Sequence, residues 1–484
     1  MYALLSVANV LGRLLLVFSA AYLMPIICSL LYRDGTLLTF IISLGICLGA
    51  AGILIFFTRH YQRELKARDG FILVTLAWTL MSAIATVPLM LHEQLSFTDA
   101  FFETMSGMTT TGATVMTGLD TLAPSINLWR HALNWFGGMG IIVLAVAILP
   151  MLGVGGMQLF RAEVPGPIKD AKLTARIADT AAVLWVIYLV LTLACTFGLW
   201  LAGMSVFDAL CHAFAALSLG GFSTRDASVG AFNSPLIEIV LMIFMVLAAL
   251  NFATHFAVFR SRSVRVYWHD AETRGVLALL TISILGCAIY LWLGDVYASF
   301  WTALRYVSFN LISIATDCGF ASTDYALWST FVPFWMLFLS AITASSGSTG
   351  GGIKMIRTLI LVRQSGRELT RLLHPAMAAP VTVGGMVIPN SVVVAILGFI
   401  FLYFMSIVAM TFLLIFGGLD FISALTAVIA CINNAGPGLG QVGPATNYAS
   451  LTDYEIWVLS FTMLLGRLEV FSLLVLFTPM FWRK

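Results

Sequence analysis

Long apolar stretches, separated by short polar segments, run along the entire chain. The hydrocarbon core of a bilayer is about 30 Å thick, and an α-helix needs about 20 residues to cross it. The pattern therefore predicts an all-α polytopic membrane protein with ten spans, near residues 5–31, 37–57, 70–91, 128–152, 180–202, 235–259, 275–296, 327–363 (interrupted), 390–417 and 454–481.

Four further segments are moderately apolar but too short to cross a membrane: residues 97–108, 206–217, 301–315 and 421–432. Each lies between a span expected to run outward and a span expected to return. Each also leads into a polar stretch that ends in a glycine, and these stretches recur about every one hundred residues. We call them the glycine loops; they cover residues 109–112, 218–221, 316–319 and 433–436.

This periodicity predicts four tandem repeats of helix, pore helix and helix around a central pore. Two extra transmembrane helices would precede them as an N-terminal extension at residues 1–69. The repeats would cover residues 70–177, 178–274, 275–389 and 390–484.

Glycine loops in this position can line a path for ions. Non-helical backbone is tolerated at membrane depth only where it is buried in protein or lines water. A short re-entrant helix followed by a returning loop turns carbonyl oxygens toward a shared axis, where they can replace the hydration shell of a cation. The alternative is four packing hairpins without a pore. The candidate ion-binding residues are Thr110, Thr111, Gly112, Leu219, Gly220, Gly221, Thr316, Asp317, Cys318, Gly319, Asn434, Ala435 and Gly436.

The eighth span is interrupted at residues 344–352, which we call the break loop. Four glycines and four hydroxyl residues fall within these nine positions, and each glycine costs a helix about 1 kcal/mol relative to alanine. We expect the backbone to unwind there and to face the aqueous path as a gate; the alternative is a packing kink. The candidate gating residues are Gly347, Ser348, Thr349, Gly350, Gly351, Gly352, Lys354 and Arg467.

Arg467 lies midway along the last expected span. An arginine at the bilayer centre costs about 3 kcal/mol on insertion scales and therefore faces protein or water. It could donate to the carbonyls of the break loop, or it could form a salt bridge with Glu469 or another buried acid. Asp317 is the only acid in the glycine loops; attracting cations and bracing the loop through backbone N–H groups are equally open roles for it.

Composition and charge agree with a membrane protein. Hydrophobic residues make up 60% of the chain and charged residues 10%, whereas soluble domains carry about 25% charged residues. Most lysines and arginines fall in five short clusters, which the positive-inside rule places in the cytoplasm. Both termini are then cytoplasmic. The clusters lie at residues 59–68, 161–176, 260–274, 354–371 and 483–484.

Seven stretches together resemble the TrkH family, the membrane subunits of bacterial Trk potassium uptake systems, in a superfamily that includes KtrB, fungal Trk and plant HKT proteins. They are TTTGAT (109–114), LGGFST (219–224), ATDCGFAS (315–322), ASSGSTGGGIK (344–354), NNAGPGLG (433–440), LLGRLE (464–469) and the glycine-rich residues 136–161.

The resemblance implies uptake of K⁺ across the bacterial inner membrane through a four-loop selectivity filter, with Na⁺, Rb⁺ and Cs⁺ as other candidate ions. It places one filter glycine in each repeat, at Gly112, Gly221, Gly319 and Gly436. It also implies a homodimer with one pore per protomer, an intramembrane gating loop, and a cytosolic TrkA-like ring with nucleotide-binding domains as partner. No covalently bound cofactor and no nucleic-acid partner are expected.

The main alternative is a potassium symporter coupled to protons or sodium, because broken helices near the midplane are also typical of secondary transporters. Four repeats in one orientation favour a central pore. An enzyme is not expected: His92-Glu93 is not followed by the second histidine of an HExxH motif, and the histidines do not cluster at metal-ligand spacing.

Overall fold

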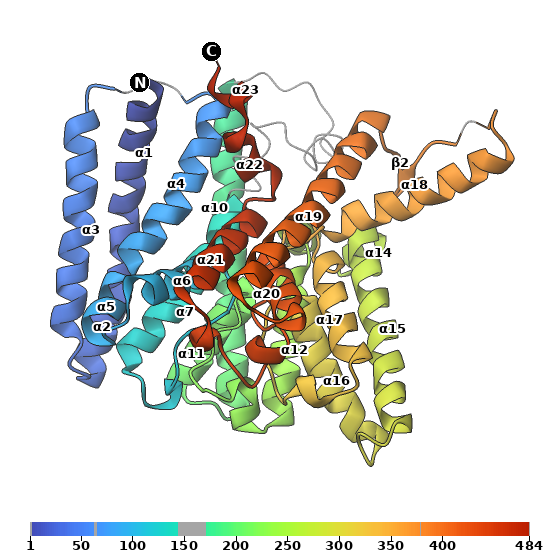
Figure 1. Cartoon of the computed structure of the whole chain (residues 1–484), viewed down its shortest axis with the longest axis horizontal. Helices are drawn as coiled ribbons and strands as arrows, with labels where there is room; N and C mark the ends of the chain where they lie inside the picture. The colour runs from blue at the N-terminus through green and yellow to red at the C-terminus, as the bar shows by residue number, and fades with distance from the viewer. Residues whose placement is uncertain (1, 62–64, 144–170, 378, 484) are drawn as a thin grey trace.

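The computed structural model describes residues 2–61, 65–143, 171–377 and 379–483. The fold is all-α and is dominated by long helices that run between two faces of the molecule (Figure 1). Both ends of the chain lie at the same face. Within the described residues the only sheet is a small antiparallel hairpin of β1 (Thr382–Val383) and β2 (Met386–Val387).

The first helices are α1 (Tyr2–Phe18), α2 (Leu23–Tyr32), α3 (Leu37–Thr58), α4 (Ala67–Ala85) and α5 (Val87–His92). The four short helices are α6 (Phe97–Met108), α11 (Val206–Ser218), α16 (Phe300–Ala315) and α20 (Phe421–Asn433). The others are α7 (Pro124–Val143), α10 (Ala171–Leu201), α12 (Pro235–Ala249), α13 (Phe252–Ser261), α14 (Arg265–His269), α15 (Ala271–Leu293), α17 (Phe331–Ile342), α18 (Met355–Leu373), α19 (Asn390–Gly417), α21 (Asp453–Arg467), α22 (Phe471–Leu474) and α23 (Pro479–Trp482).

The outer helices keep large apolar side chains on their exposed faces. On α19, for example, Phe401, Phe412 and Phe416 are 65%, 67% and 84% exposed. A soluble protein rarely leaves so much apolar surface in contact with water, whereas lipid solvates it readily. The exposed faces therefore identify an integral membrane protein.

Six helices in the described residues are long and apolar enough to cross a membrane, or eight if each of two bent pairs counts as one span. Two of the ten expected spans are missing from this count. The span at 128–152 begins as α7 but continues outside the described residues, as does much of the stretch 136–161 and of the basic cluster 161–176. The span at 327–363 is divided by the break loop into α17 and α18, as expected.

Two spans that were expected to be continuous are sharply bent. The axis turns by 99° between α12 and α13 and by 109° between α21 and the helical segment from Phe471 to Phe477. At the first bend Asn251 caps α13 by accepting the N–H of Ala253. At the second, Glu469 and Val470 have positive φ. The spans expected at 235–259 and 454–481 are therefore each made of two helices with a sharp bend between them, because tertiary contacts as well as apolar composition decide where these helices end.

The four short helices match the expected ranges to within one residue at each end. Each starts at a serine or aspartate whose side chain accepts a backbone N–H of the first turn: Ser96, Ser205, Ser299 and Asp420. At Asp420, hydrogen bonds led by the one from the backbone N–H of Ser423 hold the pKa below its usual range. Such caps satisfy N–H groups that have no partner within the helix.

Candidate ion-permeation site

The four glycine loops have the same backbone conformation. In each loop the terminal glycine and the residue two positions before it have positive φ. Glycine adopts this region without steric cost, whereas other residues need support from their surroundings. The φ pairs are 54° and 83° at Thr110 and Gly112, 55° and 65° at Leu219 and Gly221, 68° and 90° at Asp317 and Gly319, and 58° and 85° at Asn434 and Gly436.

One hydrogen bond closes each loop onto its short helix. The residue before each glycine donates its N–H to the carbonyl five residues earlier, in the manner of a Schellman cap. The four distances are equal at 2.8 Å: Thr111 to Ser106, Gly220 to Ala215, Cys318 to Ser313 and Ala435 to Ala430. Four different sequences thus build one local structure, which supports the alignment of the loops.

The loops contact one another in a closed cycle. A β-carbon added at Gly112 would lie 2.5 Å from the carbonyl oxygen of Gly220, and one at Gly319 would lie 2.5 Å from that of Ala435. A β-carbon added at Gly221 would collide with the carbonyl oxygen of Cys318, and one at Gly436 would lie 2.7 Å from that of Thr111. A cavity of about 80 Å³ is lined by all four glycines. The loops therefore meet around one point instead of being scattered as separate hairpins.

Polar side chains brace the returning part of each loop from behind. Glu103, His212 and Asn310 all lie nine residues before the glycine of their own loop. Glu103 accepts the N–H of Val115 at 3.1 Å, the ring of His212 contacts Ser223 Oγ at 3.0 Å, and Asn310 exchanges two hydrogen bonds with Ser322. In the fourth loop Thr426 accepts the N–H of Leu439, and Tyr448 donates to the Gly436 carbonyl at 2.7 Å.

The sequence interpretation missed these braces. The signal was present, since three polar residues share one position relative to the glycines inside otherwise apolar helices. The partner of Glu103 was less visible, because Arg130 lies in an expected span and has no sequence feature that points to the loop.

Glu103 and Arg130 form a buried ion pair with an N–O distance of 2.7 Å, and both side chains are 1% exposed. The guanidinium lies over the ring of Phe222, 4.3 Å from its centroid, which is a favourable cation–π geometry. Glu103 accepts the N–H of Val115, which follows the first loop, and Arg130 contacts Phe222, which follows the second. The ion pair therefore connects the first loop to the second.

The break loop lies directly against the glycine loops, at the points where these loops leave their short helices. Gly351 donates its N–H to Asp317 Oδ2 at 2.9 Å, and Thr349 Oγ1 donates to the Leu217 carbonyl at 3.1 Å. A β-carbon at Gly350 would lie 3.2 Å from the Thr316 carbonyl. Asp317 is fully buried and accepts a backbone N–H of the break loop. This geometry favours the role in which the carboxylate braces backbone N–H groups.

Arg467 holds the break loop from the other side. Its Nη1 donates to the Thr349 carbonyl at 3.1 Å and its Nη2 to the Gly137 carbonyl of α7 at 2.8 Å. Of the two alternatives, the contact with the break loop is the one observed. Glu469 instead pairs with Arg357 at 2.5 Å.

The remaining candidate gating residues stabilise the shape of the break loop. Lys354 Nζ donates to the Gly350 carbonyl at 2.6 Å, and Ser348 Oγ donates to the Ser345 carbonyl at 2.7 Å. Gly347 and Gly352 have φ of 69° and 71°. The loop is therefore an ordered, hydrogen-bonded structure at the centre of the molecule.

In this all-α integral membrane protein four short helices lead into loops that meet around one centre, an arrangement typical of membrane transport proteins. The family model described as cation transport protein matches residues 38–484. The chain belongs to this family, the TrkH family, which is a family of transporters and not a class of enzymes.

Curated relatives cover the chain from end to end. It is 45% identical to the Trk system potassium uptake protein TrkH of Salmonella typhimurium and 46% identical to that of Vibrio parahaemolyticus, each over 99% of both chains. It is 38% identical to the Trk system potassium uptake protein TrkG of Escherichia coli over 99% of this chain and 98% of the relative. The crystal structure of the potassium transporter TrkH from Vibrio parahaemolyticus superimposes with a TM-score of 0.92 at 43% identity, covering 99% of this chain and 100% of that one.

The buried ion pair yields a prediction on stability. Glu103→Gln leaves Arg130 charged, buried and without its counter-ion, and breaking such a pair costs about 3–5 kcal/mol. We expect a clear drop in the unfolding temperature of the purified protein, measured by intrinsic fluorescence. Asp99→Asn removes a half-buried carboxylate of the same helix, which has no ion-pair partner among the described residues and can still accept from Ser96 as an amide, and it should change the unfolding temperature little. Equal unfolding temperatures for the two variants would contradict a bracing role for the pair.

The cycle of contacts yields a prediction on transport. Gly319→Ser places a side chain at positive φ and against the Ala435 carbonyl, whereas Gly35→Ser meets the same φ restriction with open space around it. The φ restriction alone costs about 1–2 kcal/mol. In a liposome flux assay, Gly319→Ser should reduce K⁺ flux by roughly tenfold or more, and Gly35→Ser should retain it. Parental flux in Gly319→Ser would rule out a role for the cycle in permeation.

Proposed function

We propose that this chain takes up K⁺ across the bacterial inner membrane through a pore formed by the four glycine loops, and that the break loop closes this pore from the cytoplasmic side. The observation that carries the proposal is the closed cycle of four loops with the break loop directly beneath it. The names of the relatives that match it from end to end, potassium uptake proteins and a potassium transporter, agree with this function.

In the proposed pore, main-chain carbonyls of the candidate ion-binding residues replace water around K⁺. Backbone oxygens that the loop already holds in place can replace the hydration shell of a monovalent cation with little rearrangement of the protein. The C-terminal ends of the four short helices carry partial negative charge and lie next to the loops, which adds to the attraction. One oxygen of Asp317 has no hydrogen-bond partner among the described residues, so this carboxylate remains able to attract a cation leaving the loops.

Arg467 and the break loop form the proposed gate. The guanidinium puts a positive charge beneath the loops and holds the Thr349 carbonyl, and both effects oppose the passage of a cation. Opening requires the break loop to move away from Asp317 and Leu217. The fourfold repeat at residues 70–177, 178–274, 275–389 and 390–484, after the extension at 1–69, is part of the same proposal.

The proposed assembly is a homodimer with one pore per protomer, and both termini and the basic clusters face the cytoplasm. A cytosolic TrkA-like ring with nucleotide-binding domains would act on the break loop from that side. The common face of the two termini (Figure 1) supports an even number of crossings.

The gate is tested by Arg467→Ala. Hydrogen bonds to charged groups contribute about 1.5–3 kcal/mol each, and the substitution removes two together with the positive charge. We expect K⁺ flux into liposomes to increase roughly tenfold or more, with Arg467→Lys intermediate because it keeps the charge without the two-pronged geometry. Unchanged or lower flux from a normally folded Arg467→Ala protein would contradict the gating role.

The same liposomes separate a pore from a coupled symporter. A pore predicts K⁺ flux that follows the K⁺ gradient and membrane potential alone, with unitary currents in a planar bilayer. Fixed stoichiometric movement of protons or sodium with each K⁺ would instead support the symporter.

A further inference from the structure

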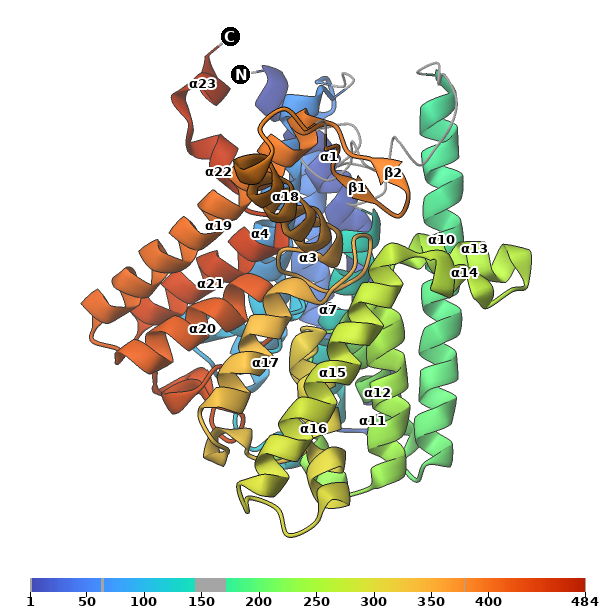
Figure 2. The same cartoon turned by 90° about the vertical axis from the view of Figure 1, so that its right-hand side faces the viewer.

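Residues 252–269 form an arm that leaves the pore region at the bend after α12. The arm consists of α13 and α14. The chain turns by 99° from α12 into α13, and Figure 2 shows both helices of the arm projecting sideways from the long helices. The arm leads directly into α15, so the end of α15 fixes the depth of the arm in the membrane. α15 has 23 apolar-rich residues, about 35 Å at 1.5 Å per residue, which is enough for one crossing. The arm therefore lies at a membrane surface.

The exposed side chains of the arm are of two kinds. Large apolar side chains alternate along it with arginines, and among the described residues none of these arginines takes part in an ion pair. The apolar residues are Phe259, Val264 and Trp268, which are 80%, 70% and 66% exposed, and the exposed arginines are Arg260, Arg262 and Arg265.

This combination matches the boundary of a bilayer. Tryptophan and other apolar side chains enter the region just below the headgroups, while arginines remain at headgroup level. Three positive charges without an ion-pair partner in the described part of the chain complement anionic phospholipids, each contributing about 1 kcal/mol of attraction near such a surface. The charge and the apolar side chains together favour a lipid surface over a purely electrostatic partner.

The arm is tied firmly to the break loop. Phe252 is buried and donates its N–H to the Gly347 carbonyl at 3.2 Å. The ring of His255 contacts Tyr267 Oη of α14 at 2.7 Å and the Leu247 carbonyl of α12 at 2.8 Å. α13 and α14 are thus joined to each other, and the first residue of α13 holds the break loop.

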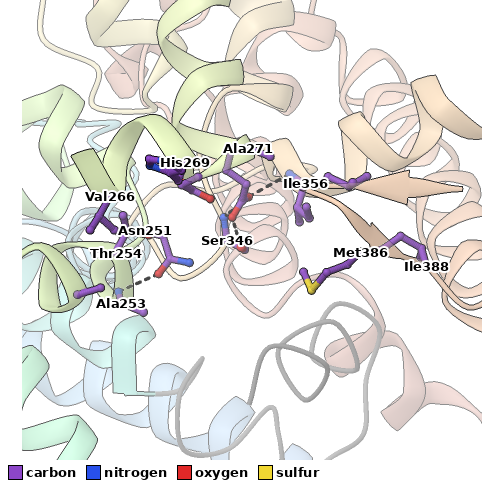
Figure 3. A pocket seen from close by; sticks show the side chains of 15 residues that line it. Asn251, Ala253, Thr254, Val266, His269, Ala271, Ser346, Ile356, Met386 and Ile388 are labelled. Atoms are coloured by element: carbon purple, nitrogen blue, oxygen red, sulfur yellow. Dashed lines mark hydrogen bonds between the residues drawn. The ribbon is translucent and has the colours of Figure 1, made fainter. Parts of the chain in front are cut away.

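A cavity of about 380 Å³ separates the arm from the β1–β2 hairpin (Figure 3). On its inner wall Glu272 accepts the N–H and the hydroxyl of Ser346, at 2.9 and 2.6 Å, and the N–H of Ile356 at 3.1 Å. One side of the cavity is the arm and another reaches the break loop, so among the described residues the arm has room to move on this side, while α13 packs against α10 on another, where Phe252 contacts Tyr188.

We infer that the arm binds anionic phospholipid headgroups of the inner leaflet and that this binding draws the break loop toward its open position. The lipid-binding half stands on the arm alone. The regulatory half rests on the proposed function, because it requires the break loop to be a gate for K⁺.

Lipid binding is tested by quenching of Trp268. The full-length protein is reconstituted with brominated phosphatidylglycerol or brominated phosphatidylcholine, and the contribution of Trp268 is obtained by comparison with Trp268→Phe. The anionic lipid should quench Trp268 more strongly. The triple variant Arg260→Gln, Arg262→Gln and Arg265→Gln should lose this preference, by about fivefold for each arginine, and the corresponding triple lysine variant should keep it. Equal quenching by both lipids in the parent protein would overturn the inference.

Regulation is tested by K⁺ flux into phosphatidylcholine liposomes with and without phosphatidylglycerol. Flux through the parent and the triple lysine variant should rise several-fold with the anionic lipid, and flux through the triple glutamine variant should not. A parent flux that is the same or lower with phosphatidylglycerol would overturn the coupling. Absence of K⁺ flux from every protein, with selective quenching intact, would instead contradict the proposed function and the regulatory half while leaving lipid binding established.

Discussion

Irregular backbone at membrane depth has to find hydrogen-bond partners within the protein, because lipid offers none. This constraint governs the centre of the molecule. Each glycine loop satisfies part of its backbone through the 2.8 Å bond to its own short helix, and the segment that follows it is held by polar side chains such as Glu103 and Thr426. The break loop in turn uses Asp317, Leu217 and Arg467 as partners. The loops and the candidate gate are therefore parts of a single hydrogen-bonded unit.

A unit of this kind can hold two states. The break loop is held by single hydrogen bonds to several elements, among them those with Ala249, Glu272 and Asp317. Each of these partners is a polar group that water could solvate in a conducting pore. The contacts behind the glycine loops are buried, with Glu103 and Arg130 almost fully excluded from solvent. In the proposed mechanism the difference leaves the loops rigid while the break loop moves. The arm that follows the bend at Asn251 could transmit such a motion, because its first residue, Phe252, donates its N–H to the Gly347 carbonyl of the break loop.

Local signals in the sequence were sufficient for the short helices and for the break loop. Capping residues such as Ser96 and Ser205 start the helices, and glycines at positive φ end the loops, so both boundaries are set by neighbouring residues. The bends were not predictable in the same way. Residues 239–250 are apolar without interruption, so composition does not show where α12 ends. It ends where the carbonyls of Ala248 and Ala249 receive N–H groups from the break loop, about one hundred residues later. The ion pair of Glu103 and Arg130 was missed for the same reason, because nothing near either residue in sequence indicates the other.

The central claim is that carbonyl oxygens of all four glycine loops coordinate one permeating ion, and anomalous diffraction from crystals grown with Rb⁺ tests it most directly. The account predicts a strong anomalous peak at the point where the loops meet, surrounded by the carbonyls of Thr111, Gly220, Cys318 and Ala435. A Rb⁺ peak held by side chains elsewhere in the protein, with no density between the four loops, would contradict the claim.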